Sequence, residues 1–153
     1  MLDPEKVKDF MLALVKAPEL EPANGKTFCN IGSRRVAELF GCEQFGPDDL
    51  ADEMISLMEA GLAYGPWTKT KFGEIAAKWA RIGGLAFAAM DSKTLGEAHG
   101  HIAAIFPAPC ELSPSLGHPV PFVANVGAKN GIMRVSEAFP VDKGEPEYYL
   151  WKL

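Results

Sequence analysis

The fold of this chain is decided around residues 83–90, which read Gly-Gly-Leu-Ala-Phe-Ala-Ala-Met. Upstream of this stretch, apolar residues recur every three or four positions, as they do on one face of a helix. Downstream of it, short apolar runs are separated by turn residues, as they are between strands. Helices followed by strands predict an α+β domain with an antiparallel sheet. No internal repeat, linker or low-complexity tract divides the 153 residues, so we expect a single domain over 1–153.

Four helices are expected before this point. Asp3 is the expected N-cap of the first helix and Thr27 that of the second, because their side-chain oxygens can accept bonds from the free N–H groups of a first turn. The expected bounds are about 4–17, 28–40 and 47–60, then an irregular stretch over 62–71 and a short helix that contains Ile75 and Trp79. The third helix is expected to bury Leu50, Met54, Leu57 and Met58.

Five strands are expected in the second half. Asn130-Gly131 is typical of a two-residue turn and predicts a hairpin between the third and fourth strands. The last strand is rich in aromatic residues, which favour strands. The expected bounds are 85–90, 101–106, 121–127, 132–138 and 147–152.

The composition limits the class of function. Hydrophobic residues make up 48% of the chain and charged residues 23%, as in ordinary globular proteins. The net charge of −5 argues against nucleic acid as the main partner, because phosphate binding needs a basic surface. No apolar run approaches the roughly 20 residues that span a bilayer, so we expect no membrane insertion. The N-terminus reads as a helix start and not as a secretion signal.

Cysteine usage singles out one residue. Three cysteines exclude a disulfide-dense framework, although a bridge between Cys42 and Cys110 stays open. Cys29 is expected in the first turn of the second helix, where free N–H groups lower a thiol pKa. This position suits a nucleophile. The alternative is that Cys29 is a small buried apolar residue.

His101 is the expected base for Cys29, because it opens the strand-like run 101–106 and can take the thiol proton. Asn125 is the one internal polar side chain of the expected strand 121–127. Its amide oxygen can orient the imidazole. The alternatives are that Asn125 faces solvent and that Glu97 or Asp91 orients the histidine.

A metal site is the other interpretation of the histidines. His99 and His101 should point to the same face of a strand, and Cys29, Cys110 or His118 would complete a ligand set. A closed zinc site usually contains a tighter ligand pair, such as Cys-x-x-Cys, and the sequence has none. We therefore expect no metal and no cofactor.

Two motifs together resemble those of the NlpC-type cysteine peptidases, small papain-like enzymes that cut peptide stems of bacterial cell walls. The family's Gly-His-Val/Ile-Ala motif is matched by Gly100-His101-Ile102-Ala103. Its nucleophile motif, a cysteine followed by small or polar residues and a helix, is matched by residues 29–39. Its third member, a polar residue on the next strand, is matched by Asn125. Over about residues 24–127 the layout is similar to that of single-domain amidase effectors of type VI secretion and of related phage endolysins.

The nucleophile region also departs from the family pattern. Many members have Asp-Cys-Ser-Gly-Phe where this chain has Phe28-Cys29-Asn30-Ile31-Gly32, and the tyrosine often found upstream is absent. The Cys29 backbone N–H is therefore the expected first donor of an oxyanion hole, and Asn24 is a candidate for the second.

The resemblance implies a papain-like fold, with N-terminal helices packed on an antiparallel sheet, and a triad of Cys29, His101 and Asn125 that needs no cofactor. It implies hydrolysis of an amide bond in the peptidoglycan stem peptide, one that involves D-glutamate and diaminopimelate. It further implies synthesis in the bacterial cytoplasm, action in the periplasm or cell wall after export by a route other than a signal peptide, and an immunity or inhibitor protein as a partner. The alternatives are an acyltransferase or deamidase of proteins that uses the same triad, and a papain-like binding module without activity.

Overall fold

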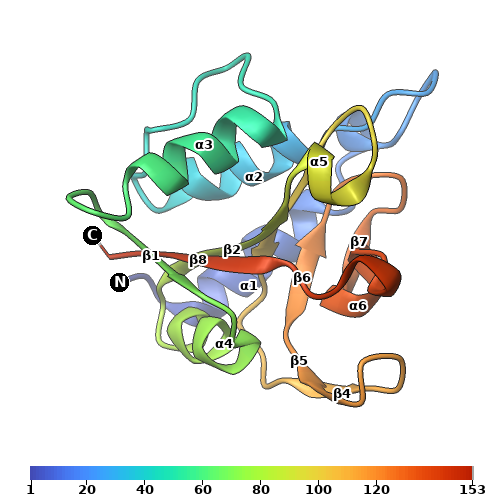
Figure 1. Ribbon diagram of the computed structural model, residues 1–153. Helices are drawn as coiled ribbons and strands as arrows, with labels where there is room; N and C mark the ends of the chain where they lie inside the picture. The colour runs from blue at the N-terminus through green and yellow to red at the C-terminus, as the bar shows by residue number, and fades with distance from the viewer. Residues whose placement is uncertain (153) are drawn as a thin grey trace.

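A six-stranded sheet organises the computed structural model, which describes residues 1–152 (Figure 1). The strand order is β1-β8-β2-β3-β6-β7, and each pairing is antiparallel. The last strand therefore lies inside the sheet, where it is hydrogen-bonded to strands on both sides. A two-stranded hairpin, β4–β5, forms a separate small sheet. The bounds are β1 Trp67–Thr70, β2 Leu85–Met90, β3 His101–Ile105, β4 Glu111–Ser113, β5 His118–Val120, β6 Phe122–Asn125, β7 Gly131–Arg134 and β8 Glu147–Trp151.

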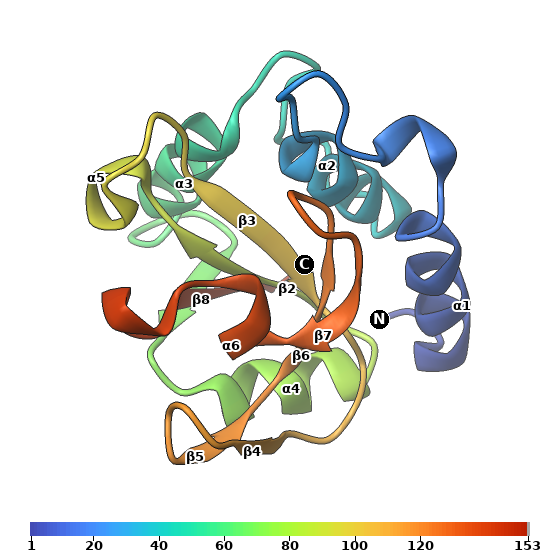
Figure 2. The ribbon, with the colours of Figure 1, turned by 90° about the vertical axis from the view of Figure 1, so that its right-hand side faces the viewer.

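Helices cover both faces of the sheet. Figures 1 and 2 show α2 and α3 on one side and α4 on the other, while α1 shares its apolar cluster with α2 and α3, and α6 shares its cluster with α4. The side chains agree, since each set of helices shares a buried apolar cluster with a different face of the strands. The bounds are α1 Pro4–Leu14, α2 Cys29–Leu39, α3 Ala51–Ala60, α4 Gly73–Arg81, α5 Ser92–Leu95 and α6 Val135–Ala138, with 3₁₀ turns η1 Pro18–Leu20 and η2 Val141–Lys143.

Strand β2 supplies residues to both cores. Leu85, Phe87 and Ala89 belong to the cluster under α1, α2 and α3, and the alternate residues Ala86, Ala88 and Met90 belong to the cluster under α4 and α6. All six side chains are buried. A continuous apolar run is what a strand covered on both faces requires.

The turn before β2 explains the glycine at position 83. Gly83 has φ +98°, and a Cβ there would lie 2.0 Å from the backbone oxygen of Leu2. The Leu2 N–H donates to the Gly83 carbonyl at 3.0 Å, so the N-terminus is fixed against this turn. Only glycine accepts both the backbone angle and the close approach.

The coarse prediction from the sequence is confirmed: the chain forms a single α+β domain whose main sheet is antiparallel. Asp3 caps α1 through its bond with the Glu5 N–H. The strands expected at 85–90, 101–106 and 147–152 correspond to β2, β3 and β8. In the described residues, no helix has the length and apolar character needed to cross a membrane.

Two predictions about where strands lie in the sequence are wrong. The stretch 62–71 contains β1, which pairs with β8 from Trp67 opposite Trp151 onwards. The expected strand 132–138 ends at Arg134, because the Glu137 carboxylate turns back to accept the Arg134 N–H and starts α6. Strand β1 depends on pairing with a distant strand, and the end of β7 depends on a local cap. Hydrophobic alternation in the sequence reports neither of these.

The hairpin expected around Asn130-Gly131 forms, since β6 and β7 pair antiparallel, but the expected two-residue turn is wrong. The connection between β6 and β7 covers residues 126–130. The Asn130 side chain accepts from the Gly127 N–H at 2.8 Å and donates to the Leu20 carbonyl at 2.8 Å. It therefore fixes this longer loop to η1 instead of forming a tight turn.

Helix α3 begins later than expected and faces the sheet with a different stripe. Met54 and Met58 are fully buried as predicted, but Leu50 and Leu57 are exposed. The other buried members are Ala51 and Ile55. Positions 51, 54, 55 and 58 form one helical face.

Candidate active site

Helix α2 begins at Cys29 and presents this residue to the sheet. The N-cap is Phe28, without a side-chain bond, so the prediction of Thr27 as N-cap is wrong. Gly32, one turn on, lies so close to Val126 that a Cβ would be 2.8 Å from a methyl carbon of that valine. The Ser33 hydroxyl donates to the Ile102 carbonyl at 3.3 Å. These contacts hold the start of α2 against β3 and the end of β6.

His101 and Asn125 are joined directly. His101 is the first residue of β3, and Asn125 is the last residue of the neighbouring strand β6. The distance from His101 Nε2 to Asn125 Oδ1 is 2.7 Å. Asn125 is 4% exposed, so the alternative in which it faces solvent is wrong.

The hydrogen bonds of Asn125 define the imidazole tautomer. Its Nδ2 donates to the Lys129 carbonyl at 2.7 Å, and a carbonyl can only accept. The amide oxygen must then face His101, so Nε2 carries the proton. The Nδ1 atom is left with a free lone pair, which is the form that a base for a thiol requires.

Two neighbours restrict the imidazole ring. Phe139 packs against it with a centroid distance of 4.8 Å and an interplanar angle of 54°. A Cβ on Gly127 would lie 3.1 Å from His101 Cε1, so glycine leaves room for the ring. The sequence reading missed both residues, because neither position stands out until the fold brings it to the histidine.

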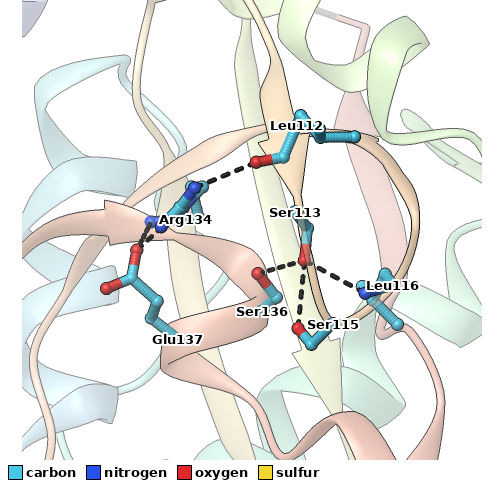
Figure 3. A network of polar contacts seen from close by, with 7 residues as sticks. All are labelled: Leu112, Ser113, Ser115, Leu116, Arg134, Ser136 and Glu137. Atoms are coloured by element: carbon cyan, nitrogen blue, oxygen red, sulfur yellow. Dashed lines mark hydrogen bonds and ion pairs between the residues drawn. The ribbon is translucent and has the colours of Figure 1, made fainter.

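A polar network joins β4 to β7 and α6 (Figure 3). The fully buried Ser113 of β4 donates to the Ser136 hydroxyl of α6 at 2.8 Å. Arg134 donates to the Leu112 carbonyl at 2.9 Å and to Glu137 at 3.1 Å. The β4–β5 hairpin is thus bonded to β7 and α6, and Phe139 is the residue immediately after α6.

Cys29 lies between two cavities. One, of about 390 Å³, is lined by Cys29, His101 and Asn125 together with charged residues. The other, of about 370 Å³, is lined by Cys29 and by the apolar side chains of Phe28, Ile31 and Leu50. Cys29 is 8% exposed, so only a small part of this residue faces solvent.

Burial governs the protonation of the Cys29–His101 pair. It raises the pKa of the Cys29 thiol, although the backbone N–H groups of Ile102, Asn30 and Cys29 oppose the rise. It lowers the pKa of His101, against the opposing effects of the Asn125 hydrogen bond and the Glu97 charge. Both shifts favour the uncharged forms of the two groups, because burial penalises charge. The N–H groups at the helix start lower the Cys29 pKa as expected, but desolvation outweighs them, so the net shift is upward and not downward.

The alternative orienting residues Asp91 and Glu97 make no hydrogen bond to His101 in the described residues. Asp91 caps α5 by accepting the Thr94 N–H at 2.7 Å, and Glu97 is an exposed residue at the cavity wall. Asn24, the candidate second oxyanion donor, lies in an exposed turn and is not among the residues that line either cavity beside Cys29.

The proposed metal ligands do not converge. His118 pairs with Glu145, whereas His99 is exposed beside Cys29. In residues 1–152 no group of three or more His, Cys, Asp and Glu side chains is placed to hold a metal ion. Cys42 and Cys110 are both free thiols, so the bridge between them is absent.

A larger cavity, of about 780 Å³, lies apart from these two, between α3, α5 and the start of β8. Its lining includes carboxylates and lysines but no cysteine or histidine. Nucleophilic chemistry therefore points to the smaller cavities beside Cys29. No protein-family model and no curated protein matches this chain.

Proposed function

We propose that this chain is a papain-like cysteine hydrolase that cleaves an amide bond in the peptide stem of bacterial peptidoglycan. The observation that carries the proposal is the 2.7 Å bond between His101 and Asn125 in a cavity that also contains Cys29 at a helix start. A nucleophile, a base and an oriented third group are the recurring parts of acyl-transfer sites.

The reaction follows from the tautomer. His101 Nδ1 takes the proton of the Cys29 thiol as the sulfur attacks the amide carbon and the carbonyl oxygen becomes negative. The free N–H of Cys29 in the first turn of α2 stabilises that oxygen. The His101 imidazolium then gives its proton to the leaving amine, and the C–N bond breaks. Water, deprotonated by His101, attacks the thioester, and the thiol is restored as the acid product leaves.

The two cavities give the substrate a direction. The leaving amine must receive its proton from His101, so the leaving half occupies the cavity that contains His101. That cavity has charges of both signs, from Glu97, Lys129 and Glu137. They suit a leaving residue with both an ammonium group and a carboxylate, as diaminopimelate has. The acyl half occupies the more apolar cavity across Cys29.

The same resemblance that suggests the reaction suggests its place. The proposed site of action is the periplasm or cell wall, reached from the bacterial cytoplasm by a route that uses no signal peptide. An immunity or inhibitor protein that covers the groove is the proposed protein partner. The peptide stem supplies the charged and apolar groups that the two cavities require.

Purified cell wall tests the function. Wild-type protein and Cys29→Ala are incubated with peptidoglycan, and the released muropeptides are analysed by mass. The proposal expects a gain of one water per cut stem with wild type only. A product in which the acyl group has gained an acceptor amine instead of water would identify an acyltransferase. Unchanged muropeptides under conditions in which the protein is folded would refute the peptidoglycan assignment.

A further inference from the structure

The segment 91–99, which is all but the last residue of the connection between β2 and β3, builds walls of both cavities beside Cys29. It contains α5, and Glu97 and His99 line the cavity of the triad. His99 also lines the more apolar cavity. The segment leads directly into Gly100 and His101, so its position determines where the backbone of His101 lies and where its imidazole ring starts.

One side chain from another element holds this segment. Asp52 of α3 accepts the Ser92 N–H at 2.9 Å through Oδ1, and its Oδ2 accepts the Ser92 hydroxyl. Figures 1 and 2 both show α5 beside α3. Within residues 1–152, these two bonds are the side-chain bonds that join segment 91–99 to a distant part of the sequence.

Asp52 also occupies the space beside Gly100. A Cβ on Gly100 would lie 2.4 Å from Asp52 Oδ1 and 3.0 Å from the Met90 carbonyl oxygen. Gly100 is buried, so a side chain there has no easy exit. The glycine before His101 therefore leaves room for the carboxylate that binds Ser92. One carboxylate contacts both ends of the connection, at Ser92 and at Gly100.

We propose that Asp52 is a positioning residue for His101, because it bonds Ser92 and packs on Gly100 and so fixes the segment that leads into the base. This inference rests on the proposed function for its catalytic consequence, but its structural part is independent of any substrate. Asp52 does not touch the reacting atoms. It acts through the placement of His99, Gly100 and His101.

Four variants separate the effect of the hydrogen bonds from that of the charge. Asp52→Ala removes both acceptors. Asp52→Asn keeps Oδ1 for the Ser92 N–H and offers an amide that can donate to the Ser92 hydroxyl. Glu53→Ala removes the neighbouring exposed carboxylate and is the matched control. Ser92→Ala removes one of the two bonds and provides a milder perturbation.

Hydrogen exchange of residues 91–100 tests the structural part. Loss of the Asp52 acceptor should speed exchange in this segment by roughly tenfold, since local opening then costs less. Kinetics on muropeptides test the catalytic part. Asp52→Ala should lower kcat by about tenfold to a hundredfold with a smaller change in KM, as expected for a displaced catalytic group. Asp52→Asn and Glu53→Ala should match wild type in both measurements, and Ser92→Ala should be intermediate.

A measurement without substrate distinguishes failure of the role of Asp52 from failure of the proposed function. Alkylation of Cys29 at pH 7 needs no substrate, and it should slow in Asp52→Ala and recover in Asp52→Asn, because His101 assists thiol deprotonation. Unchanged exchange in Asp52→Ala would overturn the inference, as would faster exchange with unchanged kcat and unchanged alkylation. A wild-type protein that cuts no peptidoglycan would refute the proposed function, while exchange and alkylation would still decide the role of Asp52.

Discussion

Replacing Asn125 by alanine removes the group that orients His101 and provides the sharpest test of the site. The substitution leaves His101 Nε2 and the Lys129 carbonyl without their 2.7 Å partners. The imidazole is then free to change its tautomer and its rotation. Asn125 does not take the proton, so Cys29 and His101 are still present but less well aligned.

The size of the effect follows from these two bonds. A buried polar group left without a partner costs about 1–3 kcal/mol, so two of them should lower the free energy of unfolding by about 2–6 kcal/mol. The loss should lie toward the lower end of this range, because the cavity lets water reach His101. Domains of this size are stable by roughly 5–15 kcal/mol, so the variant should still fold. Misalignment of a catalytic group should lower kcat by about tenfold to a thousandfold. KM should change little, because the side chain of Asn125 is already engaged on both sides.

Steady-state kinetics on a purified muropeptide, with chemical denaturation in parallel, measure both quantities. Val123→Ala is the control, because Val123 is a fully buried residue of the same strand whose truncation destabilises the core without removing a bond to His101. Asn125→Asp keeps an acceptor for Nε2 and adds a negative charge, so it should raise the His101 pKa and move the acid limb of kcat upward.

The reasoning would be refuted by an Asn125→Ala enzyme with unchanged kcat. Equal losses of kcat in Asn125→Ala and Val123→Ala would also refute it, because stability and not orientation would then explain the loss. An acid limb that does not move in Asn125→Asp would show that this side chain does not face the titrating imidazole.

Three further predictions concern the pair itself. Cys29→Ala and His101→Ala should each abolish nearly all turnover, the double variant should be little worse than either, and His99→Ala should retain turnover; loss in His99→Ala alone would reassign the base. The midpoint of the acid limb of kcat/KM should lie below the usual histidine pKa of about 6.5, because burial lowers the His101 pKa. Activity should then decline only as pH falls through that lowered pKa. A midpoint at pH 7 or above would contradict this prediction. Cys29 should be the thiol most reactive with limiting iodoacetamide, because His101 acts as its base. In His101→Ala, alkylation of Cys29 should rise only at pH above the ordinary thiol pKa, because burial raises the Cys29 pKa. Peptide mapping measures this, and preferential labelling of Cys42 or Cys110 would contradict it.

Sequence features that act over a few residues predict most of the architecture. Residues 85–90 are apolar at every position, which already requires cover on both faces, and the structure provides it. Asp3 and the proline after it start α1 where expected, because capping and a fixed φ act within one turn. The expected strand at 132–138 fails for the complementary reason. Alternation continues through Val135, but the Glu137 cap bends the chain into α6.

The candidate site divides in the same way. Residue type and motif order identified Cys29, His101 and Asn125, because a thiol at a helix start and a histidine at a strand start are visible locally. The sign of the Cys29 pKa shift was not visible. It depends on how much water reaches the sulfur, and that is set by β3, which lies across the helix start. Phe139 and Asp52 were missed because their relation to His101 exists only after distant segments pack.

The sequence by itself determined the α+β class, the helix and strand order around Gly83-Gly84 and the three residues of the candidate triad, because these depend on periodicity, backbone angles and residue chemistry over a few positions. Only the tertiary structure decided which nitrogen of His101 carries the proton, that burial outweighs the helix start at Cys29, and that Asp52 holds the approach to the base. Those three depend on desolvation and on hydrogen-bond partners that are distant in sequence, 40 residues apart for Asp52 and Ser92 and 69 for Ser33 and Ile102. Such partners are defined only when the chain has folded.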